Sequence, residues 1–303
     1  MEAPELLAPP PRPIAALRQT LVDYLSLTKP RIMVLLLITE LGAMVAAGSG
    51  HLSWQLALAG LTGGALSAGG AAAINCWYDR DIDGEMERTC RRPLPAARIP
   101  ASRGLAFGAL LGVAGFLVLA LGANLLAALL ALAGGLFYAV VYTMWLKRAT
   151  SQNIVIGGAA GAVPPLVGWA VAAHTLAPLA GVLFLIVFCW TPPHFWALSL
   201  LLRRQYARAG VPMLPVVRGE AATRRAILAY SGLLVGVSLL PTIWLGPAYL
   251  AAAATLDLAL ICLAVGALRD RGQRWAALLF HYSILYLGLL FVGVALTATF
   301  APS

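Results

Sequence analysis

The sequence has few charged residues for its length. Of its 303 residues, 11% are Asp, Glu, Lys or Arg, 61% are hydrophobic, and the mean hydropathy is +0.85. Soluble domains carry about 25% charged residues, so this composition excludes an ordinary soluble protein. The chain is therefore interpreted as a polytopic membrane protein, surrounded mainly by lipid.

The alternating ten-residue strands of a membrane β-barrel are also missing. Instead, the apolar stretches are about 20 residues long, which is the length of a membrane-spanning helix. A helix satisfies all of its own backbone hydrogen bonds in lipid. The sequence predicts an all-α bundle of nine transmembrane helices, at about 31-48, 54-77, 103-121, 124-145, 153-172, 177-201, 225-245, 248-268 and 275-298.

The sequence shows neither the paired cysteine spacing of a disulfide framework nor the features of a signal peptide. The four cysteines show neither paired spacing nor a Cys-x-x-Cys-His sequence, so no disulfide framework or covalently attached haem is implied. Residues 1–27 contain five prolines and lack an apolar core followed by a small-residue cleavage site. We expect a flexible cytoplasmic tail over residues 1–27 and a nine-helix domain over residues 28–303.

Every second loop of this nine-span map lacks Lys and Arg. The loops near Gly50, Gly122, His174 and Gly246 contain none, and all 21 basic residues lie on the other side. The positive-inside rule then places the amino terminus in the cytoplasm and the carboxyl terminus across the cell (inner) membrane. The net charge of +9 thus describes one membrane face. No basic stretch is interleaved with exposed aromatic residues, so no nucleic-acid partner is expected.

Three oxygen-bearing side chains lie four residues apart at the foot of the second span: Asn75, Asp79 and Asp83. In a helix they fall within roughly 80° of one another, on one face. Two carboxylates and an amide oxygen suit Mg²⁺, which completes its shell with water and a substrate phosphate. The alternative to a metal site is that these residues form a solvated, charged loop at the membrane interface. Three arginines follow, which can neutralise the remaining phosphate charge: Arg88, Arg91 and Arg92.

Two further segments on the same side contain candidate binding residues. Lys147 and Arg148 adjoin Tyr142 and Asn153, a group that suits a phosphate, although adjacent cations at a helix end also serve as ordinary membrane anchors. His194 lies inside the sixth span, between prolines and aromatic residues. A histidine at this depth is costly, so it is a candidate functional residue. It can ligate iron, donate a hydrogen bond to a propionate, or bond to a neighbouring helix.

Several separate motifs match one family: Asn75-x3-Asp79-x3-Asp83 with Arg91-Arg92-Pro93, Tyr142-Thr143 with Leu146-Lys147-Arg148, Trp190-Thr-Pro-Pro-His194-Phe-Trp, and Gly210-Val-Pro-Met-Leu-Pro215. In these motifs the chain resembles the protohaem IX farnesyltransferases, also called haem O synthases. They belong to the UbiA-type intramembrane prenyltransferases. The resemblance extends over about residues 20 to 298.

The resemblance implies a nine-helix bundle with a cavity opening near the cytoplasmic face. This cavity binds farnesyl diphosphate through Mg²⁺ and accepts haem b from the bilayer. Transfer of the farnesyl group to a haem vinyl group, with addition of water, gives haem O for haem-copper oxidase biogenesis. Implied partners are a downstream haem A synthase or the oxidase assembly machinery. The resemblance further implies phosphate ligands at Arg91, Arg92, Lys147 and Arg148, and a haem-pocket role for His194.

One position departs from the family pattern. Family members generally carry an acidic residue before the tyrosine in the loop after the sixth span, whereas this chain has Gln205 before Tyr206. Both residues remain candidate substrate-binding residues. Because an amide supplies no charge, we expect one firmly held Mg²⁺ at the first motif.

Two rival functions remain open. A quinone or chlorin prenyltransferase would share the same acidic motif and the same bundle. A membrane transporter is the alternative outside the enzymes, because Glu40 and Asp257 lie within spans and intramembrane acids can mark ion paths. No inverted repeat supports the transporter.

Overall fold

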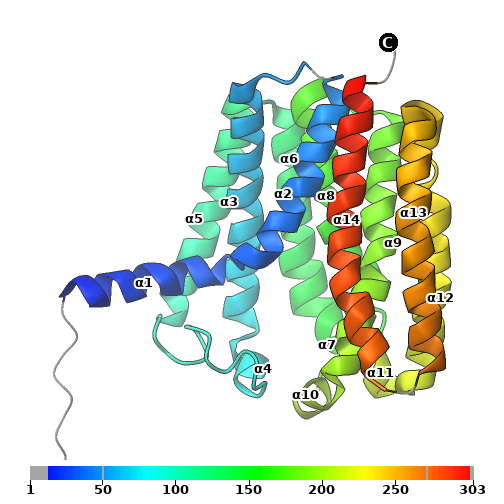
Figure 1. The fold of residues 1–303 in the computed structure, drawn as a ribbon. Coiled ribbons are helices and arrows are strands. Elements are labelled where there is room, and N and C mark those ends of the chain that lie inside the picture. Colours follow the sequence, from blue (N-terminus) through cyan, green and yellow to red (C-terminus); the bar gives the residue numbers. More distant parts are fainter. Residues whose placement is uncertain (1–12, 50, 271, 301–303) are drawn as a thin grey trace, which may run out of the picture.

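The computed structural model describes residues 13–49, 51–270 and 272–300, and all regular structure within these ranges is helical. The chain crosses the bundle nine times within this described part (Figure 1). The crossing segments are α2 (Pro30–Ala47), α3 (Trp54–Tyr78), α5 (Ala101–Gly122), α6 (Leu125–Leu136) with the π-helix η1 (Phe137–Leu146), α8 (Asn153–Ala173), α9 (Pro178–Leu201), α12 (Gly219–Ser238), α13 (Thr242–Arg269) and α14 (Arg274–Phe300).

Eight of these described segments are long and apolar enough to cross a membrane, and α12 is the ninth crossing. The first two turns of α12 carry Glu220, Arg224 and Arg225, so the helix contains a shorter apolar stretch than the other spans. α12 nevertheless packs against both α9 and α13 and lies at the outer side of the bundle next to α13 (Figure 1). The chain is therefore a multi-pass helical membrane protein, as the sequence predicts.

The seventh span ends earlier than predicted. The sequence analysis ended it at residue 245, whereas α12 ends at Ser238 and α13 begins at Thr242. The break predicted near Gly246 is present, because Gly246 adopts the non-helical angles φ 74° and ψ −169° and separates residues 242–245 from the long part of α13 that starts at Pro247. Hydropathy cannot locate the end of α12, because the residues on both sides of it are apolar.

Glycine allows the helices at one side of the bundle to pack closely. A Cβ atom on Gly70 of α3 would lie 2.6 Å from the backbone oxygen of Gly108 in α5, and a Cβ on Gly108 would lie 2.9 Å from the oxygen of Gly70. Such distances exclude any larger residue at both positions. Close backbone approach at small residues is a main source of helix association in lipid.

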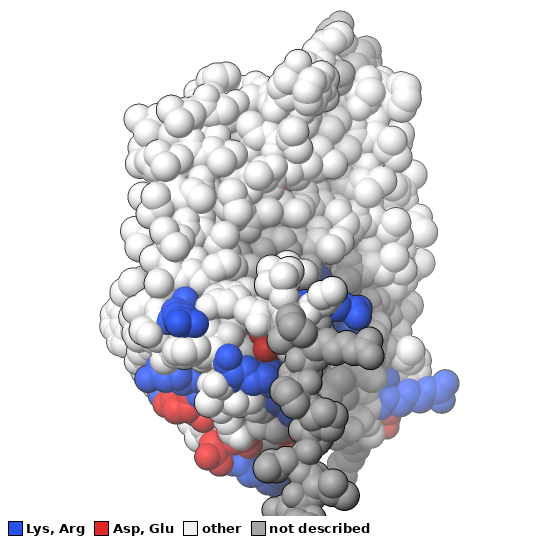
Figure 2. Space-filling view, turned by 90° about the vertical axis from the view of Figure 1, so that its left-hand side faces the viewer, with Lys and Arg blue, Asp and Glu red and all other residues white. Residues whose placement is uncertain are grey.

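Short helices gather at the basic end of the bundle, namely α4 (Arg80–Gly84), α7 (Lys147–Ala149), α10 (Arg203–Arg208) and α11 (Leu214–Val217). They lie at the lower end of Figure 1. Figure 2 shows Lys and Arg side chains collected at the same end, while the upper part of the visible face is uncharged. The surface along the spans carries exposed large apolar side chains, such as Leu110, Leu117 and Leu121 of α5, which suits contact with lipid.

Residues 13–27, which the sequence analysis assigned to the tail, include a helix, α1 (Pro13–Leu27), and residues 1–12 lie outside the described part. Proline is well tolerated at the first position of a helix, and the residues after it form helices readily. The end of α1 contacts the bundle: Leu27 is buried, and Asp23 forms an ion pair of 2.9 Å with Arg98. The hydrogen bonds from Arg98 lower the pKa of Asp23.

Candidate active site

The acidic motif lies where α3 passes into α4 at the basic end. Asn75 is in the last turn of α3, Asp79 caps this helix, and Asp83 is in α4. The chain stays nearly helical through the junction, because Asp79 N donates to Asn75 O at 2.9 Å and Asp83 N donates to Asp79 O at 2.8 Å. All three side chains are buried, with exposed fractions of 3%, 1% and 4%.

Basic side chains hold the oxygens of this motif. Lys147 Nζ forms a short ion pair with Asp79 Oδ2, and Arg92 Nη1 lies 2.7 Å from Asp83 Oδ2. Asn75 Nδ2 donates to the same Asp79 oxygen at 2.7 Å. A buried carboxylate requires such partners, because removing its charge from water is costly. The cations suited to a diphosphate therefore already surround the acids.

Arg148 extends to Asp81 on the outer side of the motif. Two guanidinium nitrogens donate to the Asp81 carboxylate at 2.7 Å each, whereas Asp79 Oδ1 lies 3.6 Å from the guanidinium. The hydrogen bonds from Arg148 lower the pKa of Asp81 to about 2. Asp81 is 60% exposed, so it positions Arg148 at the rim of the motif.

The sequence analysis missed Lys29 as a member of this site. Its Nζ donates to Asn75 Oδ1 at 2.5 Å and lies 3.5 Å from the Tyr138 hydroxyl. Lys29 adopts the left-handed conformation (φ 53°, ψ 57°) immediately before Pro30, which is unusual for a lysine. Strained backbone of this kind is concentrated at functional sites. The available signal was a lysine before a proline at the foot of the first span, but the sequence analysis counted Lys29 only among the 21 basic residues that set the topology.

The π-helix η1 brings polar groups toward Asn75. Thr143 is fully buried, and its hydroxyl accepts from Asn75 Nδ2 at 2.9 Å while it donates to the Tyr138 carbonyl at 2.8 Å. π-Helical turns are rare and occur mostly at functional sites. Asn153, at the start of α8, donates to the Lys147 carbonyl at 3.2 Å, which fixes the backbone that carries Lys147.

A second cluster joins the loops after α4 and α9 to the same end. The buried side chains of Tyr142 and Tyr206 belong to this cluster together with Met86 and Met213. Burial raises the pKa of Tyr206, and the guanidinium of Arg88 lies close enough to its hydroxyl to lower that pKa in part.

Two of the predicted residues stand apart from these contacts. Arg91 is exposed, and its carbonyl accepts a hydrogen bond of 3.2 Å from Arg98. Gln205 Oε1 is buried and has no hydrogen-bond partner in the described part of the chain.

Two buried oxygen atoms at this end are of the chemical types that Mg²⁺ binds. Asp79 Oδ1 and Gln205 Oε1 are both buried without a hydrogen-bond partner among the described residues, and carboxylate and amide oxygens are the ligand types that Mg²⁺ takes. No group of three or more His, Cys, Asp and Glu side chains with metal-site geometry occurs in the described ranges. The predicted ligand set contains two carboxylates, Asp79 and Asp83, and one amide, Asn75. An amide does not belong to these residue types, so the lack of such a group in the described ranges does not exclude this set.

His194 lies deeper, in the second-last turn of α9. Its Nδ1 lies 2.7 Å from Ser283 Oγ of α14, and its ring stacks on Trp190 and Phe280. The next residue, Phe195, packs against the cluster of Tyr142 and Tyr206. The structure therefore connects His194 to the basic end through its neighbour rather than through a direct polar contact.

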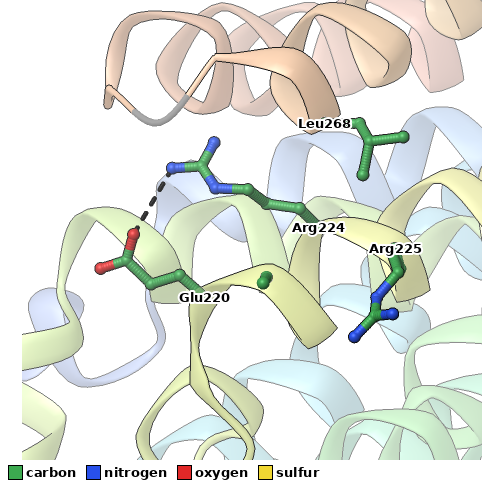
Figure 3. A pocket seen from close by; sticks show the side chains of 5 residues that line it. Glu220, Arg224, Arg225 and Leu268 are labelled. Atoms are coloured by element: carbon green, nitrogen blue, oxygen red, sulfur yellow. Dashed lines mark ion pairs between the residues drawn. The ribbon is translucent and has the colours of Figure 1, made fainter.

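A hollow of about 400 Å³ lies elsewhere, between α12 and α13 (Figure 3). Arg224 extends into it toward Glu220, with an ion pair of 3.5 Å, and donates to the carbonyls of Ala267 and Asp270 at 2.7 and 2.6 Å. These bonds tie the end of α13 to α12. The residues that line this hollow are distinct from the acidic motif.

Residues 36–285 match the model of the UbiA prenyltransferase family. The chain belongs to this family. A Symbiobacterium thermophilum protein named Protoheme IX farnesyltransferase is 53% identical over 286 residues, which cover 93% of this chain and 95% of the relative. A Gloeobacter violaceus protein of the same name is 53% identical over 298 residues, covering 97% and 98%. The protein is therefore a transferase of the UbiA family.

Solved structures of the family share this fold. A digeranylgeranylglyceryl phosphate synthase has a TM-score of 0.76 at 20% identity, covering 93% of this chain and 99% of that chain. A UbiA homologue from Archaeoglobus fulgidus, solved with DMAPP and Mg²⁺, has a TM-score of 0.63 at 17% identity, covering 90% and 99%. At these identities the likeness establishes the fold alone.

Proposed function

We propose that this protein transfers a farnesyl group from farnesyl diphosphate to a vinyl group of haem b, with addition of water, to give haem O. The main support is the 53% identity to proteins named Protoheme IX farnesyltransferase over more than nine tenths of both chains. Residues 28–303 form the catalytic domain in this proposal. A downstream haem A synthase and the oxidase assembly machinery remain predicted partners.

The acidic motif is the proposed diphosphate site. Asn75, Asp79 and Asp83 supply oxygen ligands that suit Mg²⁺, and this ion neutralises the diphosphate and favours its departure when it is bound. Lys147 and Arg92 now pair with Asp79 and Asp83. In this proposal both cations also contact phosphate oxygens, because each already lies at a carboxylate of the motif that holds the diphosphate.

The chemistry requires no nucleophilic side chain. The C1–O bond of farnesyl diphosphate breaks, and the electron pair leaves with the diphosphate. The vinyl π electrons then form the new C–C bond, and water adds to the cation left beside the porphyrin and loses a proton. The stacked rings of Tyr138 and Tyr142, 5.4 Å apart, provide aromatic faces near the motif that can stabilise the allylic cation and exclude water.

The proposed orientation places the basic end in the cytoplasm. The charged diphosphate group of the substrate is soluble in water, so the substrate can reach the site from this side. The amino terminus then lies inside and the carboxyl terminus lies across the cell inner membrane. Labelling of single cysteines introduced at Ser53 and at Arg208, in a protein whose four native cysteines are replaced by serine, tests this orientation. Only the second should react with an impermeant reagent added to inside-out vesicles.

The buried acids that suggested a transporter have a structural explanation in part. Asp257 accepts hydrogen bonds from Ser238 at 2.8 Å and from Tyr286 at 2.7 Å, which join α12, α13 and α14. The Glu40 carboxylate lies against Gly64, where a Cβ atom would lie 2.2 Å from Glu40 Oε2. These contacts support helix packing as the role of Asp257.

The test of the proposed function compares two acceptors. Membranes containing the protein are incubated with labelled farnesyl diphosphate and either haem b or 4-hydroxybenzoate, and the products are separated by chromatography. Label in a haem product supports the proposal. Label in the benzoate product alone would establish the quinone prenyltransferase instead.

A further inference from the structure

The imidazole of His194 is held in one orientation by three neighbours. Trp190 stacks on one side with ring centroids 4.3 Å apart and an interplanar angle of 16°, and Phe280 stacks with centroids 4.8 Å apart at 25°. Nδ1 lies 2.7 Å from Ser283 Oγ. Trp190 also donates its indole N–H to the Ser283 carbonyl at 2.7 Å, which fixes the backbone of that serine.

The hydrogen bonds of Ser283 determine which ring nitrogen carries the proton. Ser283 Oγ lies 2.7 Å from the Phe280 carbonyl oxygen, which can only accept. The single hydroxyl proton must lie between these two oxygens, because two acceptors this close would otherwise repel each other. Ser283 Oγ therefore accepts from Nδ1–H of His194. In the neutral imidazole, Nε2 then carries a lone pair and no proton.

Nε2 makes no hydrogen bond with any residue in the described part of the chain. As an acceptor, it cannot donate a hydrogen bond to a propionate. A neutral imidazole whose Nδ1–H is bonded to an oxygen is the usual form of a histidine that binds a metal through Nε2. The sequence analysis left three roles open for His194: iron ligand, hydrogen-bond donor to a propionate, or partner of a neighbouring helix. This tautomer excludes the role of propionate donor through Nε2 and favours the role of iron ligand.

We propose that His194 Nε2 binds the iron of the haem substrate as an axial ligand, and that Ser283 is the positioning residue that directs this lone pair. The inference rests on haem being the acceptor in the proposed function. Axial binding fixes the distance of the porphyrin from α9. Phe195, adjacent to His194, packs against the cluster of Tyr142 and Tyr206, so a porphyrin bound here lies next to the basic end of the bundle.

The experiment measures haem binding without turnover. Purified protein in nanodiscs is titrated with haem b in the absence of farnesyl diphosphate, and the iron ligand is identified by the absorption bands and by the resonance Raman Fe–N(His) band. Wild type should show imidazole ligation. His194→Ala should lose it, and added imidazole should restore it by occupying the space of the missing ring.

Ser283→Ala tests the positioning role. Loss of a hydrogen-bond partner behind a metal-binding histidine typically weakens metal affinity by about 10–100-fold, so haem affinity should fall within this range and the Fe–N(His) band should shift. Ser283→Thr keeps the hydroxyl group, so its haem affinity and its Fe–N(His) band should be those of the wild type. The matched control is Ser199→Ala, since Ser199 is fully buried in α9 and donates to the Trp196 carbonyl at 2.9 Å without contacting a histidine. Ser199→Ala should leave the haem affinity and the Fe–N(His) band unchanged.

Two results overturn the inference. One is an unchanged imidazole band in His194→Ala without added imidazole, and the other is a Ser283→Ala protein, folded by its melting temperature, with wild-type affinity and band position. If His194→Ala does not fold, the Ser283 series alone decides. Failure of the proposed function is distinguishable, because it appears as absence of farnesylated haem from wild-type protein under turnover conditions, whatever the binding spectra are.

Discussion

Replacement of Asp79 by asparagine is the sharpest perturbation of the acidic motif. Asp79 is 1% exposed, and one of its oxygens pairs with Lys147 while the other lies 3.6 Å from Arg148. Asparagine keeps the size of the side chain but removes its charge. Two cations then lose their shared partner, and the proposed Mg²⁺ loses an anionic ligand.

The expected magnitude follows from burial. Breaking a buried ion pair costs about 3–5 kcal/mol, and loss of one preorganised electrostatic group lowers kcat by about 10²–10³-fold. We therefore expect Asp79→Asn to lower farnesyl transfer by at least about 10²-fold. The helix junction should survive, because the backbone bond from Asp79 N to Asn75 O does not involve the carboxylate.

The assay is haem O formation by purified protein at saturating farnesyl diphosphate, with folding checked by size-exclusion chromatography. Asp81→Asn is the matched control: it is the same substitution two residues away, at a side chain that is 60% exposed. Exposed ion pairs are worth about 0–1 kcal/mol, so this variant should lose less than about fivefold. The reasoning would be refuted if both variants lost the same activity, or if Asp79→Asn kept more than half.

Four further substitutions examine other residues of the proposed site. Lys29→Met should raise the KM for farnesyl diphosphate about tenfold or more, because it removes the cation on Asn75, and an unchanged KM would show that Lys29 only anchors α2. Gln205→Asp should lower the Mg²⁺ concentration for half-maximal activity; an unchanged titration would separate this loop from the metal. Lys147→Ala should weaken binding of a non-hydrolysable farnesyl diphosphate analogue and spare haem, whereas His194→Ala should do the reverse. Loss of the analogue in His194→Ala would contradict the division of the cavity.

The sequence predicts the spans well because lipid imposes a simple requirement on them. A helix must be about 20 residues long and apolar to cross the bilayer, and this leaves a local signal in almost every span. The signal fails at Leu239–Pro241, where neither charge nor polarity marks the turn. Gly246, which the sequence marks as a break, does interrupt the helix, because its backbone is non-helical within α13. Tertiary packing, which the sequence does not display, determines where the chain reverses.

The part of the candidate site whose residues are close together in the sequence can be predicted from the sequence. Asn75, Asp79 and Asp83 are four residues apart, and the backbone stays nearly helical between them, so their relation follows from helix geometry alone. Lys29 lies 46 residues from Asn75 and reaches it through a left-handed turn before Pro30. The pairing of His194 with Ser283 spans 89 residues. Contacts of this kind depend on how the helices pack, and a single sequence contains no record of that packing.

The arrangement of charge also gives the site a physical reason to stay folded before substrate arrives. Asp79 and Asp83 are buried, and buried carboxylates without partners would destabilise the junction of α3 and α4. Lys147 and Arg92 remove this cost in the free protein, and they are also the residues suited to the phosphates. In the proposed function Mg²⁺ and the diphosphate carry opposite charges, so Mg²⁺ would replace the two cations at the carboxylates, and the diphosphate would replace the two carboxylates at the cations. Because no pair has to be broken without replacement, binding of the two together should be strongly cooperative, and either one alone should bind weakly.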